Sequence, residues 1–262
     1  MTKIFNADAY KFRKNIASWL LPTAAVVAAL VTAVFMYFID HGLTVEGGEA
    51  VSTLDVFGFN PAGAMGAYAL SSISNLFAIL AVVFSGLFIS SEFAGGTIRN
   101  AICIGKSRIK VYLSKLVMCG IMLLIIMLAA AVGFIVIFTV MYGFGDGSGF
   151  LADSLKVFGL QFLYHLTYAS LACMLAFLIQ NIVTSVSVGI FCTIFSGVLT
   201  DVFTAFDGLG WLARFMPNYY ITRLLDNVTN MGFIIQSIAA CVMFIAITSI
   251  IGCSVFKERD IN

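Results

Sequence analysis

The sequence predicts an all-α, polytopic membrane protein whose 262 residues form a single transmembrane domain, 1–262, with six spans. The first reason is composition: 61% of the residues are hydrophobic and only 10% are charged, whereas soluble domains carry about 25% charged residues. The second is that the apolar residues gather in segments of about 20 residues, the length that a membrane-crossing helix needs. This composition argues against a cytosolic enzyme, and a net charge of only +1 argues against a nucleic-acid partner.

The predicted elements follow one another along the chain with few breaks. Residues 1–18 mix basic with aromatic and aliphatic side chains, which predicts an interfacial helix against the inner leaflet; a frayed basic tail that only sets topology is the alternative. The six spans are expected at residues 19–39, 66–90, 116–142, 157–179, 182–203 and 231–256. Only Gln180 and Asn181 separate the fourth span from the fifth, so these two should form a tight antiparallel hairpin.

The distribution of basic residues predicts the orientation in the membrane, because Lys and Arg accumulate on the cytoplasmic side. Eleven of the 14 lie on the side that holds both termini: Lys3, Lys11, Arg13, Lys14, Arg99, Lys106, Arg108, Lys110, Lys115, Lys257 and Arg259. The opposite side holds three, Lys156, Arg214 and Arg223, together with nine acids: Asp40, Glu46, Glu49, Asp55, Asp146, Asp153, Asp201, Asp207 and Asp226. We therefore expect a plasma-membrane protein with both termini in the cytoplasm.

Two sets of small or polar residues repeat at helical spacing inside the spans. Candidate pathway-facing residues are Ser71, Asn75, Gln161, His165 and Tyr168. Polar groups in lipid need partners, so these faces point either at neighbouring helices or into a wet, substrate-facing cavity. The fifth span carries small residues at every fourth position: Ser185, Gly189, Thr193 and Gly197. Such a stripe favours a close helix–helix seam, either within the chain or between subunits.

No catalytic or metal-ligating residue is expected in this chain. Ser85 and His165 could in principle form an intramembrane protease pair, but their predicted depths in the bilayer differ by roughly 10 Å. The two histidines, His41 and His165, cannot supply an HExxH zinc site, and the six cysteines fit neither a zinc site nor external disulfides. Residues 105–107, Gly-Lys-Ser, resemble the end of a P-loop, but Asn100 stands where that motif needs glycine.

The second cytoplasmic connection, residues 91–115, carries the clearest local pattern. Two glycines break the preceding helix before Thr97, which could act as an N-cap, and residues 98–104 then make about two helical turns with Ile98 and Ile102 on one face. Ser107 could cap the helix of the third span. A short amphipathic helix between two spans suits docking to a cytoplasmic partner, and a basic loop that touches lipid headgroups is the alternative.

A family resemblance rests on this connection. Glu92, then Gly96-Thr97, Arg99, Ser107-Arg108 and Lys115 at their spacing resemble the link between spans two and three in permease subunits of type-2 ABC exporters. The chain looks most similar to the small permeases that accompany bacitracin and lantibiotic resistance or immunity ATPases. The likeness covers the whole chain. It includes the external interfacial segment 204–230, where RFMPNYY at 214–220 resembles an aromatic-proline patch. Gly105 and Lys106 replace the apolar-Pro pair that many relatives carry before Ser-Arg.

The resemblance implies that the short helix is a coupling helix seated in a cleft of a separate ATPase. The implied ATPase contacts are Glu92, Gly96, Thr97, Ile98, Arg99, Ile102, Lys106 and Arg108. Two permease copies, or a homologous pair, would combine with two ATPases that bind ATP and Mg, so this chain would be no enzyme and hold no cofactor. The system would export a hydrophobic or cationic amphiphile such as an antimicrobial peptide. Alternatives are a gradient-driven secondary carrier and a non-transporting membrane scaffold or sensor.

Overall fold

The protein is an all-α, multi-pass membrane protein. A computed structural model describes residues 2–42, 74–142, 150–206, 208–227 and 229–258, and in these ranges every regular element is helical. Within these ranges six helices are long and apolar enough to cross a membrane. They are α2 (Ala17–Gly42), α5 (Ser74–Ala94), α7 (Arg108–Tyr142), α8 (Phe150–Ile179), α9 (Ile182–Ala205) and α12 (Met231–Glu258). The predicted fold class is confirmed.

Several helices run beyond the spans predicted from hydropathy. Helix α5 ends at Ala94 rather than near residue 90, and α7 begins at Arg108 rather than near residue 116, so Glu92 and Lys115 belong to helices. Hydropathy misses these turns because a helix continues into the interfacial region, where charged side chains are tolerated. Residues 66–73, the predicted start of the second span, lie outside the described residues.

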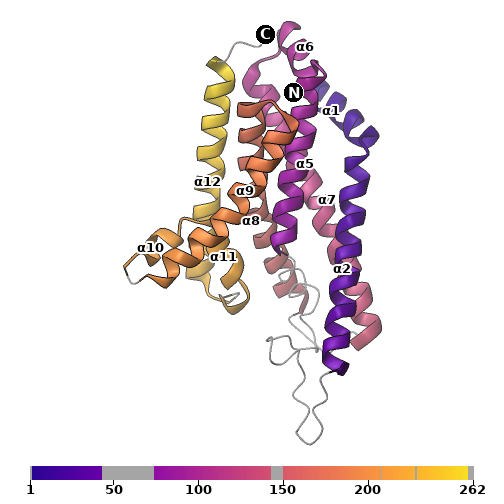
Figure 1. Cartoon of the computed structure of the whole chain (residues 1–262), viewed down its shortest axis with the longest axis vertical. Helices are drawn as coiled ribbons and strands as arrows, with labels where there is room; N and C mark the ends of the chain where they lie inside the picture. Colours follow the sequence, from indigo (N-terminus) through magenta and orange to yellow (C-terminus); the bar gives the residue numbers. More distant parts are fainter. Residues whose placement is uncertain (1, 43–73, 143–149, 207, 228, 259–262) are drawn as a thin grey trace, which may run out of the picture.

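Helices α5 and α8 form the centre of the bundle, and the other long helices pack around them (Figure 1). Helix α8 contacts α5, α7, α9 and α12, while α2 lies along α7. One end, here called the terminal end, holds α1 (Thr2–Lys14), α6 (Thr97–Cys103) and the C-terminal turn of α12. Away from the terminal end, α10 (Gly210–Ala213), α11 (Pro217–Arg223) and the 3-10 turn η1 (Leu225–Asn227) lie at one side of the bundle, between the end of α9 and the start of α12. This region is here called the far end, although α2 and α7 extend beyond it.

Aromatic rings close the terminal end of the bundle. The ring centroid of Phe177 on α8 lies 4.7 Å from that of Phe256 on α12 and 4.9 Å from that of Tyr112 on α7. Phe93 on α5 joins them at 5.4 Å from Phe177. Tilted and edge-on pairs of this kind contribute about 0.5–1.5 kcal/mol each beyond their buried area. Four long helices are therefore held together close to the level of α6.

The small-residue stripe of α9 forms a seam inside the chain, against α5. A Cβ placed on Gly189 would lie 2.6 Å from a methyl carbon of Val82, and one placed on Gly86 would lie 2.7 Å from a methyl carbon of Val186. Ser90 donates a hydrogen bond of 3.2 Å to Ser185 in the same seam. Of the two sequence-based alternatives, the structure assigns the stripe from Ser185 to Gly189 to an intrachain contact.

Helices α8 and α9 form the tight hairpin that the sequence predicts. Gln180 adopts a left-handed backbone with φ of 59°, and the side chain of Asn181 caps α9 by accepting the N–H of Thr184 at 3.1 Å. The predicted external segment folds into α10, α11 and η1, and Pro217, Tyr220 and other residues of α11 are buried against the bundle.

Candidate functional site

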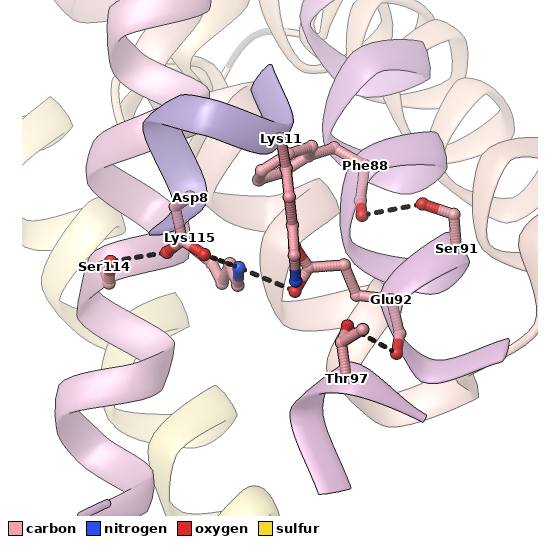
Figure 2. Close-up of polar contacts among 8 residues, drawn as sticks. All are labelled: Asp8, Lys11, Phe88, Ser91, Glu92, Thr97, Ser114 and Lys115. Atoms are coloured by element: carbon pink, nitrogen blue, oxygen red, sulfur yellow. Dashed lines mark hydrogen bonds and ion pairs between the residues drawn. The ribbon is translucent and has the colours of Figure 1, made fainter. Parts of the chain in front are cut away.

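Four charged side chains from three helices meet next to α6 at the terminal end (Figure 2). These residues, here called the charged cluster, are Asp8 and Lys11 on α1, Glu92 on α5 and Lys115 on α7. The ammonium nitrogen of Lys115 contacts a carboxylate oxygen of Asp8 and lies 2.6 Å from Oε2 of Glu92. Lys11 approaches the other carboxylate oxygen of Glu92 at 3.4 Å. Two cations and two anions make the cluster neutral.

Three members of the charged cluster are almost completely buried. The exposed fractions of Lys115, Asp8 and Glu92 are 2%, 3% and 7%. Ser114 donates a further hydrogen bond to Asp8 at 2.7 Å, and the ammonium of Lys115 lies 5.1 Å from the ring centroid of Phe88. Because buried ions are tolerated only when they are closely paired, the cluster ties α1, α5 and α7 to one arrangement.

Helix α6 is bracketed by two glycines rather than capped by Thr97. Gly96 is the N-cap residue with φ of 66°, and Gly105 follows the helix with φ of 82°. Glycine adopts this left-handed backbone without a steric penalty. The prediction of Thr97 as a cap is wrong, because the turn leaves it inside the helix. Its hydroxyl instead donates to the carbonyl oxygen of Glu92 at 3.1 Å, which fastens α6 to the end of α5.

The apolar face of α6 packs on the protein's own bundle. Ile98 is 1% exposed and belongs to the main hydrophobic core, and Ile102 packs partly buried against the same core. The expectation that Ile98 contacts an ATPase is therefore corrected, since its side chain has no surface left for a partner. The residues exposed on and just after the helix are Arg99, Asn100, Cys103, Ile104 and Gly105. Ile104 is 78% exposed.

The remaining predicted ATPase contacts, Lys106 and Arg108, are also directed toward the protein's own helices. Arg108 donates from Nη1 to the carbonyl oxygens of Phe256 and Lys257, both at 2.9 Å, so this cation caps the C-terminus of α12. Lys106 lines a cavity of about 250 Å³ between α1, α6 and α7, whose wall includes the whole charged cluster. Of the eight predicted contacts, the structure brings Glu92, Thr97, Ile98 and Lys106 to the wall of this one cavity, where Glu92 and Ile98 are buried and Thr97 and Lys106 partly buried. Arg99 is exposed.

A second cavity, of about 310 Å³, lies between α5, α8, α9 and α11 and is here called the far cavity. Its apolar wall includes Ile79, Ile194 and Val198. The polar side chains in its wall are Asn75, Tyr168, Thr193, Asp201, Asn218 and Thr222. Two of the predicted pathway-facing residues, Asn75 and Tyr168, thus share a cavity with Thr193, which the sequence assigned to the helix seam. Gly197 also lines this cavity, beside Asn218.

The other pathway-facing candidates lie elsewhere. Gln161 and His165 are fully buried, and Nε2 of His165 lies 2.7 Å from the carbonyl oxygen of Ser74, so His165 joins α8 to α5. Ser71 lies outside the described residues. Ser85 donates its hydroxyl to the carbonyl oxygen of Ala81 at 2.7 Å. Ser85 and His165 therefore bond to separate carbonyl groups, in keeping with the depth argument against a protease pair.

Sequence reasoning missed two acidic residues of these sites. Asp8 is the only acid before Asp40 in a strongly basic segment, and an isolated acid among cations could have indicated an ion pair. Asp201 was counted with the external acids, although it falls inside the predicted fifth span. An acid within an apolar helix is itself a signal of a functional position.

Comparison with protein families finds one that matches residues 25–262, and its description is "Protein of unknown function (DUF2705)". The match covers most of the chain. The protein belongs to the DUF2705 family. The DUF2705 match begins inside α2, so α1 with Asp8 and Lys11 precedes it, whereas α6 and the far cavity lie within it. A search of curated proteins found no match to this DUF2705 chain.

Proposed function

We propose that this protein is the permease subunit of an ABC exporter in a bacterial plasma membrane, with both termini in the cytoplasm. The observation that carries the proposal is α6, a seven-residue helix between two spans with its inner face locked to the bundle. Arg99 and Asn100 on the helix and Ile104 just after it are exposed, on the side to which the sequence assigns eleven of 14 basic residues. An exposed isoleucine that follows an exposed arginine by five residues suits insertion into a protein cleft.

The contacts around α6 allow a push on it to reach three helices. Thr97 joins α6 to the end of α5, and Ile98 anchors it in the hydrophobic core. The neighbouring charged cluster then connects α5 to α7 and α1. A neutral, buried set of ion pairs resists sliding because any displacement leaves a charge unpaired in a low-dielectric site. When ATP binding closes the partner ATPases, their push on α6 would therefore move α1, α5 and α7 together. It would not simply bend the connection between α5 and α7.

The resemblance to type-2 exporter permeases supplies the rest of the proposal. The ATPase is a separate chain that binds ATP and Mg, and a second permease copy or a homologous permease completes the path. The substrate is a hydrophobic or cationic amphiphile, such as a lantibiotic-like peptide, moved toward the outer face. In this scheme Arg99 and Ile104 contact the ATPase directly. Glu92, Thr97 and Lys106 lie between α6 and the bundle and support the helix from that side.

Crosslinking tests the proposed ATPase contact. A photo-reactive amino acid replaces Ile104 in the tagged chain, which is expressed in its source cells and irradiated there. The expected product is a covalent complex with an ABC ATPase, identified by mass spectrometry. A matched probe at Val242, which is 53% exposed on the long face of α12, should give no such product.

Charge changes provide the quantitative arm of this test. Ile104→Asp and Arg99→Glu should each lower the ATPase that copurifies at least tenfold, which corresponds to about 1.4 kcal/mol of binding free energy. Arg214→Glu, an exposed residue at the far end, should leave copurification unchanged. Wild-type recovery of the ATPase with both Arg99→Glu and Ile104→Asp, together with no ATPase crosslink at Ile104, would contradict the proposal and favour a gradient-driven carrier.

A further inference from the structure

The hydroxyl groups that line the far cavity determine which hydrogen bonds it can offer to a ligand. Three hydroxyl groups line it, those of Tyr168, Thr193 and Thr222. A hydroxyl carries one hydrogen and two lone pairs. Once a protein group accepts that hydrogen, the hydroxyl can only accept a hydrogen bond from a ligand. Thr193 donates to the carbonyl oxygen of Gly189 at 2.9 Å, and Thr222 donates to that of Asn218 at 3.2 Å.

The hydrogen of Tyr168 is committed as well. Tyr168 and Ser196 share a hydrogen bond of 3.0 Å in which either oxygen could donate. Ser196, however, gives its hydrogen to the carbonyl oxygen of Thr193 at 2.8 Å. Tyr168 is therefore the donor to Ser196. With their hydrogens committed, the three hydroxyl groups in the wall have only lone pairs to offer a ligand, that is, they act as acceptors.

Asp201, an exposed residue of α9 at the mouth of the cavity, adds a negative charge to this acceptor-rich wall. An ionised carboxylate only accepts hydrogen bonds. The ion pairs found among the described residues all belong to the charged cluster at the terminal end, so within that part of the chain no Lys or Arg pairs with Asp201. Asn75 and Asn218 supply the remaining polar groups, and their amides can accept or donate.

The apolar wall of the far cavity continues into the exposed apolar side of α9. Ile194 and Val198 line the cavity and are 57% and 52% exposed in the single chain. A ligand whose charged group sits near Asp201 could therefore extend an alkyl chain over these residues toward lipid. A cavity of about 310 Å³ accommodates a head group but not a whole peptide.

We propose that the far cavity binds the protonated primary amine of a cationic amphiphile, with Asp201 as its counter-ion. A primary ammonium group brings three N–H donors and one positive charge, which the acceptor hydroxyls and the carboxylate complement. A quaternary ammonium group carries the same charge without a donor and is the poorer ligand. As a substrate site this inference rests on the proposed function, but the binding itself can be measured without an ATPase.

Calorimetry on the purified full chain in a nonionic maltoside detergent tests this site. Dodecylammonium and dodecyltrimethylammonium are the probes, because they share charge and chain length and differ in N–H donors. Dodecylammonium should bind at least tenfold more tightly. Asp201→Asn should weaken its binding at least tenfold. Asp226→Asn should leave it unchanged, because Asp226 is likewise exposed at the same end but does not line the cavity.

A second variant keeps the test decisive if Asp201→Asn fails to fold. Thr193→Val removes one acceptor at nearly constant volume, and it should reduce the preference for dodecylammonium while sparing dodecyltrimethylammonium. Equal affinity of the two probes for the wild-type chain, or unchanged dodecylammonium binding by folded Asp201→Asn, would overturn the proposal. Loss of the Ile104 crosslink would leave this binding result standing, and the reverse also holds, so the two proposals fail separately.

Discussion

At the scale of single residues, Lys115 decides how the terminal end holds together. Its ammonium group sits between the carboxylates of Asp8 and Glu92 and is 2% exposed. Without this cation, two buried negative charges would face each other with only Lys11 nearby, whose side chain is 41% exposed. Removing one partner from a buried ion pair costs more than the pair contributes, because the remaining charge stays unsolvated.

We therefore expect Lys115→Ala to lower the free energy of unfolding by about 3–5 kcal/mol. Thermal unfolding of the detergent-solubilised chain measures the effect. Lys110→Ala removes an exposed cation from the same helix and should change stability by less than about 0.5 kcal/mol. If Lys115→Ala and Lys110→Ala unfold at the same temperature, the charged cluster is solvated and does not join the helices.

A rescue experiment separates charge from packing in the same cluster. Combining Lys115→Ala with Asp8→Asn and Glu92→Gln removes both orphaned charges, and should recover part of the lost stability because neutral groups are cheaper to bury. A triple variant as unstable as Lys115→Ala alone would indicate that the packing of the lysine stem, rather than its charge, stabilises the joint.

At the scale of elements, the seam between α5 and α9 depends on the absence of side chains. Gly86 and Gly189 each receive a valine methyl group of the opposite helix at a distance that no Cβ tolerates. Close approach of two helices gains van der Waals contact along their length, which is the main source of helix association in lipid. The stripe therefore stabilises the packing of α5 on α9 within the single chain, ahead of any contact between subunits.

Gly189→Leu should accordingly destabilise the chain itself by about 1–3 kcal/mol or more, through overpacking against Val82. Thermal unfolding is again the measurement, with Gly159→Leu on α8 as the control, since a Cβ there meets nothing within 4 Å. A lower oligomeric mass with an unchanged melting temperature would contradict this expectation, because it would place the seam between subunits.

At the scale of the whole molecule, orientation in the membrane is the property from which the proposed function starts. Helices α1 and α6 and the end of α12 lie at one end (Figure 1), in agreement with an even number of spans. The assignment of that end to the cytoplasm rests on the eleven-to-three distribution of basic residues. It stays a prediction, and the coupling role of α6 depends on it.

Cysteine labelling tests the orientation in intact cells. In a background without the six native cysteines, single cysteines at Glu49, Gly147 and Gly208 should react with a membrane-impermeant maleimide, whereas one at Lys106 should react only after the cells are opened. Labelling at Lys106 from outside would place α6 on the external face and remove the argument for an ATPase contact.

Several features of this protein follow from the sequence by itself. The spans, the N-terminal helix, the hairpin after Ile179 and the short helix near residues 97–103 all follow from hydropathy, charge and turn residues. These signals are local: each depends on a stretch of at most about 20 residues and on the medium around it. That is why the fold class was predictable while helix ends, where hydropathy falls gradually, were several residues in error.

Only the tertiary structure decided which faces of those helices are occupied. The sequence suggests that Ile98 is a docking residue, whereas the bundle places it in the hydrophobic core. A sequence shows that a helix face is apolar, but not which element covers that face. Asp8 and Lys115 stand 107 positions apart, and no local pattern pairs them. The far cavity likewise arises where four helices meet, and the acceptor character of its wall follows from how their side chains hydrogen-bond to backbone carbonyl groups once the helices are packed.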